Sequence, residues 1–269
     1  MIRLASRALA AALVLFPATA FALDPGTTDA NAIMQAVEAR DTGAESVSRL
    51  EITIRDAGGR ERSRVVQTKA MKVDTGRKQL FLFESPADVK NAGFLSYDHD
   101  TGSDDQWLYL PSLGKTTRIA SADKSGSFMG TDLTYADLTS KDPANYQYTL
   151  VKDNDPVDGE DCWVIEAQPT TEDEKKETGY LKTQVWISKD KLMPLKAKSW
   201  VIQGQRMKYS TFSDVREVGG VWVAHSTQVT TTRNGDMESQ STLRFSSLQI
   251  GEGLVTEDDF TERRLEQGL

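Results

Sequence analysis

The chain has 269 residues, and its 40 Asp and Glu residues outnumber its 32 Lys and Arg residues, which gives a formal net charge of −8 at pH 7. This acidic balance argues against nucleic acid as a partner, because phosphate neutralisation requires an excess of basic residues. It also disfavours adsorption to anionic membrane surfaces. One cysteine and two histidines exclude an internal disulfide and are too few for a histidine-based zinc site, so we expect no metal and no cofactor.

The first 22 residues have the pattern of a secretory signal peptide. Arg3 and Arg7 precede an apolar stretch at 8–16, and the segment ends in Ala-Phe-Ala at 20–22. We expect cleavage after Ala22, export to the periplasm of a Gram-negative bacterium, and no lipid anchor, because no cysteine follows the cleavage site. No later stretch is apolar enough to cross a membrane. We therefore expect residues 23–269 to form a single soluble domain.

The first predicted elements of the exported chain are a helix and a hairpin. Residues 29–40 have helical spacing, with Asp29 as a plausible N-cap. Leu50, Ile52 and Ile54 alternate with polar residues, which predicts a half-buried strand. A Gly-Gly-Arg turn at 58–60 leads to a second strand at 64–73.

The next strands are apolar on two faces. LFLFE (80–84), GFLSYD (93–98) and QWLYLP (106–111) are short runs of this kind, which indicates that both faces are covered. The acidic stretch DHDTGSDD (98–105) separates the last two. Oxygen-rich loops can bind Ca²⁺, but the spacing differs from that of an EF-hand. A hydrated hairpin tip is the simpler interpretation.

The central segment GSFMGTDLTYADL (126–138) interrupts the strands. Gly126 and Gly130 flank Phe128 and Met129 and give the backbone freedom. We expect a lid in which Asp132 or Thr131 caps a short turn, while Leu133, Tyr135 and Leu138 face the sheet and Phe128 and Met129 lie at a cavity mouth. The alternative is an ordinary loop that plugs the core.

Strands resume after this segment and are joined by short connections. Asn-Gly in RNGD (233–236) is a hairpin signal, TTEDEKKETGY (170–180) is a charged loop or short helix, and a helix can start at Thr256. The predicted strands are 146–152, 162–168, 183–188, 195–202, 205–212, 221–232 and 238–250. Because almost no connection is long enough for a parallel crossover, the sheet must be mainly antiparallel. A barrel, a sandwich and one strongly curved sheet all remain open.

Catalytic motifs are missing from the sequence. It contains no G-x-S-x-G, H-E-x-x-H, C-x-x-C or P-loop pattern. Cys162 lies in a predicted strand and is best interpreted as a small buried hydrophobe. We expect no catalytic residue, although the many carboxylates leave a secreted hydrolase as an alternative.

Aromatic and Met residues on several strand faces can line a dry cavity for a flexible apolar ligand, or can fill a closed core. The candidate ligand-binding residues are Phe81, Phe83, Leu95, Trp107, Tyr109, Phe128, Met129, Leu133, Tyr135, Trp200, Met207, Tyr209 and Trp222. Few helices are available to cover a large sheet, which favours the cavity.

Three stretches carry a resemblance to a known family. DDQWLYLPSLGKTTRI (104–119) is followed by SGSFMGTDLTYADLTS (125–140), and then by DCWVIEAQP (161–169) with VWISKDKLMPLKAKSW (185–200). In order and spacing, across about residues 30–262, the chain resembles the outer-membrane lipoprotein-sorting (LolA-like) proteins, in the branch associated with RND-type exporters.

The resemblance implies a mainly β fold, namely a strongly curved antiparallel sheet that forms an incomplete, open β-barrel with a few short helices as lid or plug. It implies a carrier, expected to be a monomer, that shelters the acyl chains of a lipoprotein or other lipid between an inner-membrane RND-type transporter and the outer membrane. A non-catalytic adaptor of a membrane transporter is the alternative.

Overall fold

The computed structural model describes residues 23–100 and 102–269, so the predicted signal peptide and its cleavage site lie outside the described residues. Thirteen strands and three short α-helices form within these two ranges. The helices are α1 (Ala30–Glu38), α2 (Glu172–Thr178) and α3 (Glu262–Gln267). The strands are β1 (Glu45–Asp56), β2 (Glu61–Val73), β3 (Gly76–Ser85), β4 (Gly93–His99), β5 (Asp105–Leu110), β6 (Lys115–Arg118), β7 (Tyr146–Lys152), β8 (Cys162–Pro169), β9 (Tyr180–Ser188), β10 (Pro194–Val201), β11 (Arg206–Val218), β12 (Val221–Arg233) and β13 (Asp236–Gly251).

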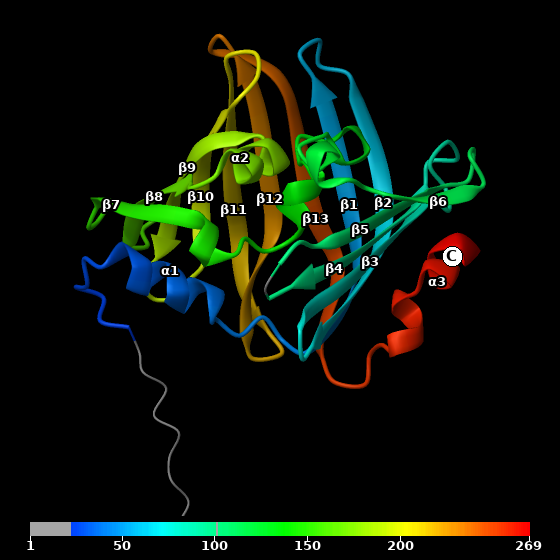
Figure 1. The fold of residues 1–269 in the computed structure, drawn as a ribbon, viewed down its shortest axis with the longest axis horizontal. Helices are drawn as coiled ribbons and strands as arrows, with labels where there is room; N and C mark the ends of the chain where they lie inside the picture. The colour runs from blue at the N-terminus through cyan, green and yellow to red at the C-terminus, as the bar shows by residue number, and fades with distance from the viewer. Residues whose placement is uncertain (1–22, 101) are drawn as a thin grey trace, which may run out of the picture.

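All these strands belong to one antiparallel sheet with the order β6-β5-β4-β3-β2-β1-β13-β12-β11-β10-β9-β8-β7. Consecutive strands are neighbours except for β6 and β7, which form the two edges of the sheet. The first strand also pairs with the last, from Glu45 opposite Gly251 to Asp56 opposite Ser239. The sheet is strongly curved and stays open between its edge strands β6 and β7 (Figure 1). The prediction of a mainly β, open antiparallel barrel with a few short helices is confirmed.

The hairpins follow from local sequence signals. On β1, Leu50, Ile52 and Ile54 are buried while their neighbours are more exposed, as the alternation predicts. Between β12 and β13, Asn234 and Gly235 both adopt positive φ, of 54° and 96°. Two such residues are what a type I′ hairpin turn requires.

Helix α1 covers one end of the sheet near β7 and β8 (Figure 1). The predicted N-cap is confirmed, because the Asp29 carboxylate accepts hydrogen bonds from the backbone N–H groups of Asn31 and Ala32. Ile33 is fully buried against Trp163 and Ile165 of β8, with the partly buried Met34 and Val37 beside it. The apolar face of the helix therefore anchors it on the sheet.

The C-terminal segment covers the opposite face of β3 to β5. The 3₁₀ turn η5 (Glu257–Phe260) and α3 place Val255, Phe260 and Leu265 against Leu80, Leu82 and Leu95. The Tyr97 hydroxyl donates to the carbonyl of Phe260, and the Lys69 ammonium lies 2.6 Å from the Asp259 carboxylate. This cover explains why the middle strands are apolar on the face turned away from the barrel interior.

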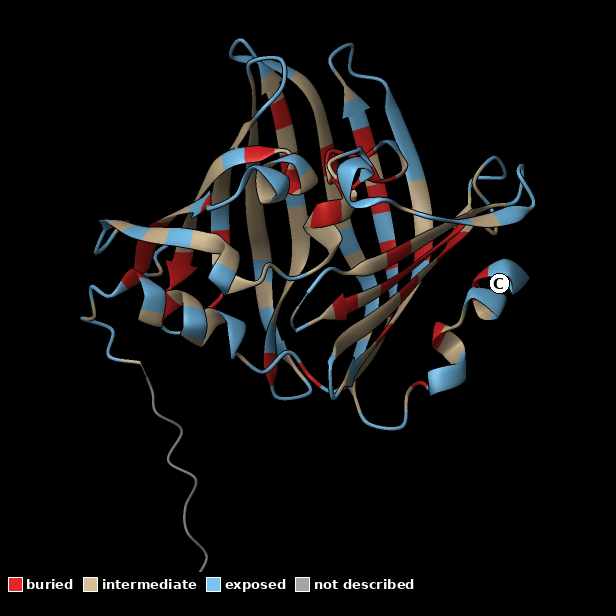
Figure 2. Cartoon of the chain, viewed as in Figure 1, coloured by how far each residue is buried: buried red, intermediate tan, exposed pale blue. Residues whose placement is uncertain are grey.

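The chain that joins β6 to β7 crosses the open side of the barrel. It contains four 3₁₀ turns, η1 (Ser121–Asp123), η2 (Phe128–Gly130), η3 (Tyr135–Leu138) and η4 (Pro143–Asn145). In Figure 1 these turns lie in front of the concave face, between the two halves of the sheet. Figure 2 shows buried residues on β1, β3 and β4 and mainly half-buried residues on β11 to β13.

Candidate ligand-binding cavities

Residues 126–138, here called the plug, fill one half of the concave face. Phe128 is 1% exposed and meets the rings of Phe81, Phe83, Phe94 and Tyr135 at centroid distances of 5.3–6.1 Å. Leu133, Tyr135 and Leu138 pack on the same cluster, as predicted. We expected Phe128 at a cavity mouth, but the structure places it at the centre of an aromatic core.

The backbone of the plug differs in detail from the prediction. Gly130 adopts φ of +75° and Met129 adopts φ of 50°, which turns the chain sharply behind Phe128. The second short turn is capped by Thr134, in a reciprocal capping box with Asp137. Neither Thr131 nor Asp132 caps this turn, because the Asp132 side chain points into the sheet.

The Asp132 carboxylate ties the plug to β12 and β13. It is 5% exposed and accepts hydrogen bonds from the hydroxyls of Thr231, Ser239 and Ser241 at 2.5–2.7 Å. The backbone N–H of Asp132 in turn donates to Ser241 Oγ at 2.9 Å. A buried carboxylate with this many donors is well satisfied, so the plug is held to a second part of the sheet.

A second buried carboxylate connects the plug to β9 and β11. The Tyr180 hydroxyl donates to Asp137 at 2.8 Å, and the Lys208 ammonium lies 3.7 Å from the same oxygen. Burial raises the pKa of Asp137, but Lys208 and Lys141, together with hydrogen bonds from Thr134 and Tyr180, outweigh this effect, and the net pKa lies below the ordinary value. The plug therefore spans from the β1–β5 half to the β9–β13 half through polar contacts.

The larger of the two hollows described here, called the charged cleft, has a volume of about 1170 Å³ and lies beside the plug. Its walls come from the end of α1, the first residues of β3, the end of β4, and the chain at 139–145. Its floor includes three half-buried apolar side chains of β13, Phe245, Leu248 and Ile250. Ligand pockets typically occupy about 300–1,000 Å³, so the cleft is large enough for a lipid-sized ligand.

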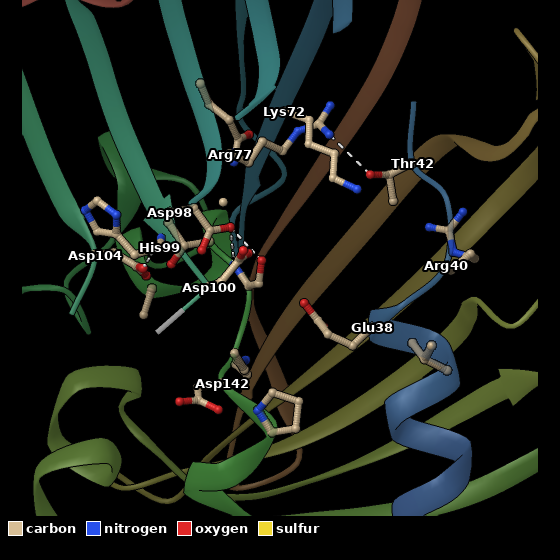
Figure 3. Close-up of a pocket in the computed structure, with 18 of the residues that line it drawn as sticks. Glu38, Arg40, Thr42, Lys72, Arg77, Asp98, His99, Asp100, Asp104 and Asp142 are labelled. Carbon is tan, nitrogen blue, oxygen red and sulfur yellow. Dashed lines mark hydrogen bonds between the residues drawn. The ribbon is translucent and has the colours of Figure 1, made fainter. Parts of the chain in front are cut away.

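Cations line one part of the cleft. Figure 3 shows Lys72 and Arg77 close to Thr42, with Arg40 on the chain after α1. Arg77 donates to Thr42 Oγ1 at 3.2 Å, and Arg40 donates to the carbonyl of Trp222 at 3.1 Å. No carboxylate oxygen of the described residues lies within 4.0 Å of the charged nitrogens of these three side chains. Burial lowers the pKa of both arginines, which nevertheless remain charged.

Carboxylates line another part. Glu38 at the end of α1 lies across from Asp98, Asp100 and Asp142 (Figure 3). Burial and the repulsion of these three carboxylates raise the pKa of Glu38. Burial also raises the pKa of Asp98, although the N–H and the hydroxyl of Ser140 donate to it at 2.9 and 2.5 Å.

Close packing of the backbone at Gly76 determines how the β3 and β4 walls of the cleft meet. Gly76 has φ of +138°, and a Cβ atom on it would lie 2.0 Å from the carbonyl oxygen of Asp98. Only glycine fits at this approach. Gly76 is the first residue of the β3–β4 ladder, in which Arg77 lies opposite Asp98. Asp98 is buried rather than at a hydrated hairpin tip, and the described residues contain no metal-binding group of three or more His, Cys, Asp or Glu.

A second hollow, here called the apolar cavity, has a volume of about 280 Å³ and adjoins the cleft. Glu38, Thr139, Lys141, Pro143 and Thr178 line both. The remaining walls are mostly apolar or aromatic and include Met34 of α1, Tyr146 and Tyr148 of β7, Val185 of β9, Ala197 of β10 and Phe212 of β11.

The predicted ligand-binding residues fall into three places. Phe81, Phe83, Phe128, Met129, Leu133 and Tyr135 belong to the plug cluster. Leu95, Trp107 and Tyr109 lie on the opposite face, under the C-terminal segment. Trp200, Met207, Tyr209 and Trp222 lie on β10 to β12, where Lys182 and Lys198 stack on Trp200. Of the thirteen, only Trp222 lines either of the two hollows described above, and contact of the others with a ligand stays a prediction.

Sequence reasoning missed the cleft residues themselves. Glu38, Arg40 and Arg77 lie at element ends, where charged residues are common and periodicity carries no information. Phe245 and Leu248 lie in a strand whose extent was predicted. A bulge between Arg49 and Leu50 in the β1–β13 ladder, however, shifts the alternation of inward and outward side chains along this strand. Cys162 is buried on β8 as predicted, and burial raises the pKa of its thiol to about 11.

No helix among the residues with assigned structure combines the length and the hydropathy needed to cross a membrane.

A family model described as an uncharacterized protein family matches residues 75–267. A comparison with curated proteins gives no match.

The fold is shared with several solved structures. A domain of an outer-membrane lipoprotein-sorting protein from Vibrio parahaemolyticus has 32% identity and a TM-score of 0.79, over 88% of this chain and 98% of that one. A DUF1329 family protein from Desulfovibrio piger has 27% identity and a TM-score of 0.78, over 90% and 100%. A LolA superfamily protein from Nitrosomonas europaea, at 17% identity and a TM-score of 0.65 over 87% and 98%, shares the fold. With an open barrel, an internal plug and this level of identity, the chain belongs to the outer-membrane lipoprotein-sorting protein family.

Proposed function

We propose that the protein is a periplasmic, non-catalytic carrier that shelters the acyl chains of a lipoprotein or another lipid. In this proposal it receives its cargo from an inner-membrane RND-type transporter, works as a monomer and passes the cargo toward the outer membrane. The observation that carries the proposal is the pair of adjoining hollows, about 1170 and 280 Å³, beside a firmly packed plug.

A lipid needs such a carrier because exposing its acyl chains to water costs a large free energy. Each methylene removed from water contributes about 0.8 kcal/mol, so a lipid with two or three acyl chains does not diffuse freely across an aqueous compartment. The apolar cavity offers aromatic and aliphatic walls from α1 and β7 to β11. The cleft offers an apolar floor of Phe245, Leu248 and Ile250 on β13. An acyl chain that runs from the cleft into the cavity would lose most of its contact with water.

A structural adaptor is less well supported, because a solid core would leave no connected hollow next to the plug. A hydrolase is also less well supported. The carboxylates of the cleft are arranged as a group around Glu38, and no hydrogen bond joins a Ser or Thr hydroxyl to a His among the described residues that line it.

The test is lipid recovery from protein purified from its native compartment, by extraction and mass spectrometry, with titration of a fluorescent fatty-acyl probe. We expect co-purified lipid and saturable probe binding that Phe212→Asp weakens at least about tenfold, since a charge in the cavity must be desolvated. Val218→Asp is the control, because Val218 is half-buried on the same strand and lines neither hollow. Absence of both lipid and probe binding in the unmodified protein would overturn the proposal.

A further inference from the structure

The charged cleft contains unpaired groups of both signs around one hollow. Lys72, Arg77 and Arg40 lie on one part of its wall, and Glu38 and Asp142 on another (Figure 3). Elsewhere the cations of this protein are often paired, as in Lys124 with Glu177 at 2.5 Å and Lys69 with Asp259 at 2.6 Å. The cleft charges are therefore kept apart although they share one hollow.

The cationic part is built to hold an anion. Arg77 is oriented by its two hydrogen bonds to Thr42 Oγ1 and the carbonyl of Gly43, both at 3.2 Å. Lys72 makes no side-chain hydrogen bond or ion pair with the described residues, and its ammonium points into the hollow (Figure 3). A guanidinium and an ammonium that lie side by side repel each other. A phosphate between them would relieve that repulsion and accept charge-assisted hydrogen bonds.

The carboxylate-lined part of the cleft favours a cationic group. Glu38 faces Asp98, Asp100 and Asp142, and burial together with the repulsion of these carboxylates raises the pKa of Glu38. Asp98 is satisfied by Ser140, and Asp142 caps η4 through the N–H of Ala144 at 2.9 Å. The side chain of Glu38 makes no hydrogen bond or ion pair with any residue that the structure describes. An ammonium group in the hollow would be stabilised by these carboxylates.

The cleft also leads to apolar surface on two sides. Its floor is Phe245, Leu248 and Ile250, and the residues it shares with the apolar cavity begin at Glu38. A ligand that fills both hollows must therefore have a charged head and at least one apolar chain.

We infer that the charged cleft binds the headgroup of a zwitterionic glycerophospholipid, with its phosphate on Lys72, Arg77 and Arg40 and its ammonium on Glu38 and Asp142. The acyl chains then extend over β13 and into the apolar cavity. This inference rests on the proposed carrier function and names its cargo class. A triacylated lipoprotein terminus, which carries no phosphate, would leave both sets of charges without a partner.

The experiment measures uptake of three lipids with the same fluorescent acyl chain, delivered from neutral detergent micelles. The lipids are phosphatidylethanolamine, with both charges, phosphatidylglycerol, with phosphate only, and diacylglycerol, with neither. For the unmodified protein we expect the tightest binding for phosphatidylethanolamine, weaker binding for phosphatidylglycerol and the weakest for diacylglycerol.

Two double variants test the cationic part and the carboxylate part of the headgroup site separately. Lys72→Gln with Arg77→Gln should weaken both phospholipids about tenfold and leave diacylglycerol unchanged, since a charge-assisted hydrogen bond contributes more than the 1.4 kcal/mol that a tenfold change requires. Glu38→Gln with Asp142→Asn should remove the preference for phosphatidylethanolamine over phosphatidylglycerol. Asparagine also caps helices well, so η4 should persist.

The control variant is Asp56→Asn with Arg60→Gln, an exposed pair at the β1–β2 turn, remote from the residues that line either hollow. It should change no uptake. If the Arg77→Gln variant does not fold, Lys72→Gln alone preserves the test, because the Lys72 side chain makes no hydrogen bond or ion pair with the described residues.

Three results separate the two levels of the proposal. Equal uptake of the three lipids, unaffected by either variant, would overturn the headgroup assignment and leave the carrier function standing. A preference for phosphatidylglycerol would overturn the zwitterionic assignment. Failure of the unmodified protein to take up any of the three would overturn the carrier function as well.

Discussion

The two halves of the concave face differ in how they are covered. On β1 to β4, Leu50, Ile52, Val66 and Phe94 are at most 5% exposed beneath Phe128. On β11 to β13, residues such as Phe212, Phe245 and Leu248 remain half-buried and line the two hollows. The same curved sheet thus has a packed half, which stabilises the fold, and an unfilled half, which is available to a ligand.

The difference arises from the connection between the edge strands. The chain between β6 and β7 must cross the open side of the barrel, and its apolar residues are concentrated between Phe128 and Leu138. The following residues, from Thr139 to Asn145, are mainly polar and line the hollows without filling them. One crossing segment therefore closes one half and leaves the other open.

The largest expected effect is on the packed half. Phe128→Ala should lower the free energy of unfolding by about 3–5 kcal/mol, the usual cost of truncating a fully buried Phe. Urea unfolding monitored by circular dichroism measures this loss. A loss below about 1 kcal/mol would mean that Phe128 is not at the centre of the packed half.

The next effect concerns the contact between the two halves. Asp132→Ala removes the acceptor of three buried hydroxyls and should cost about 1–3 kcal/mol, because those hydroxyls lose their partner. It should also increase amide exchange in residues 126–138. Asp123→Ala is the control, since Asp123 is exposed on the same connection, and an equal loss there would contradict the role of Asp132.

A matched substitution in the unfilled half should behave differently. Phe212→Ala should cost less than about 2 kcal/mol, because the ring is only half-buried, and should weaken binding of an acyl probe about fivefold. Isothermal titration gives the affinity, and the same urea series gives the stability. Comparable destabilisation by Phe128→Ala and Phe212→Ala would remove the distinction between the halves.

The smallest effect is the pH dependence of the cleft. The folded-state pKa of Glu38 lies above its ordinary value of 4.5, so the ionised carboxylate destabilises the fold at neutral pH. This cost is lost as pH falls through the folded pKa toward 4.5 and does not change further below that.

The measurement compares the unmodified protein with Glu38→Gln. Their difference in unfolding free energy should shift in favour of the unmodified protein between neutral pH and 4.5, by less than about 1 kcal/mol because Glu38 opens into solvent. A shift toward the variant on acidification would show that the environment of Glu38 favours its charge.

Much of the fold follows from local patterns. The alternation of Leu50, Ile52 and Ile54 specifies a strand with one buried face, and Asn234-Gly235 specifies a tight hairpin. The run LFLF at 80–83 indicates two covered faces, which the plug and the C-terminal segment supply.

The site depends on contacts between residues far apart in sequence. The run at 80–83 does not reveal which cover meets Phe81 and which meets Leu80, and GSFMG does not reveal whether Phe128 opens or fills a cavity. Asp132 reaches Ser241, 109 residues away, and Glu38 meets Asp142 only after the barrel curves.

The sequence alone therefore determines the strands, their hairpins and the short helices, because these rest on backbone preferences and on burial with a period of two. Only the tertiary structure decides where the sheet is filled and where it is hollow. That outcome depends on the path of one crossing segment over a curved sheet, and on charges that approach one another only after the sheet has closed most of the way around it.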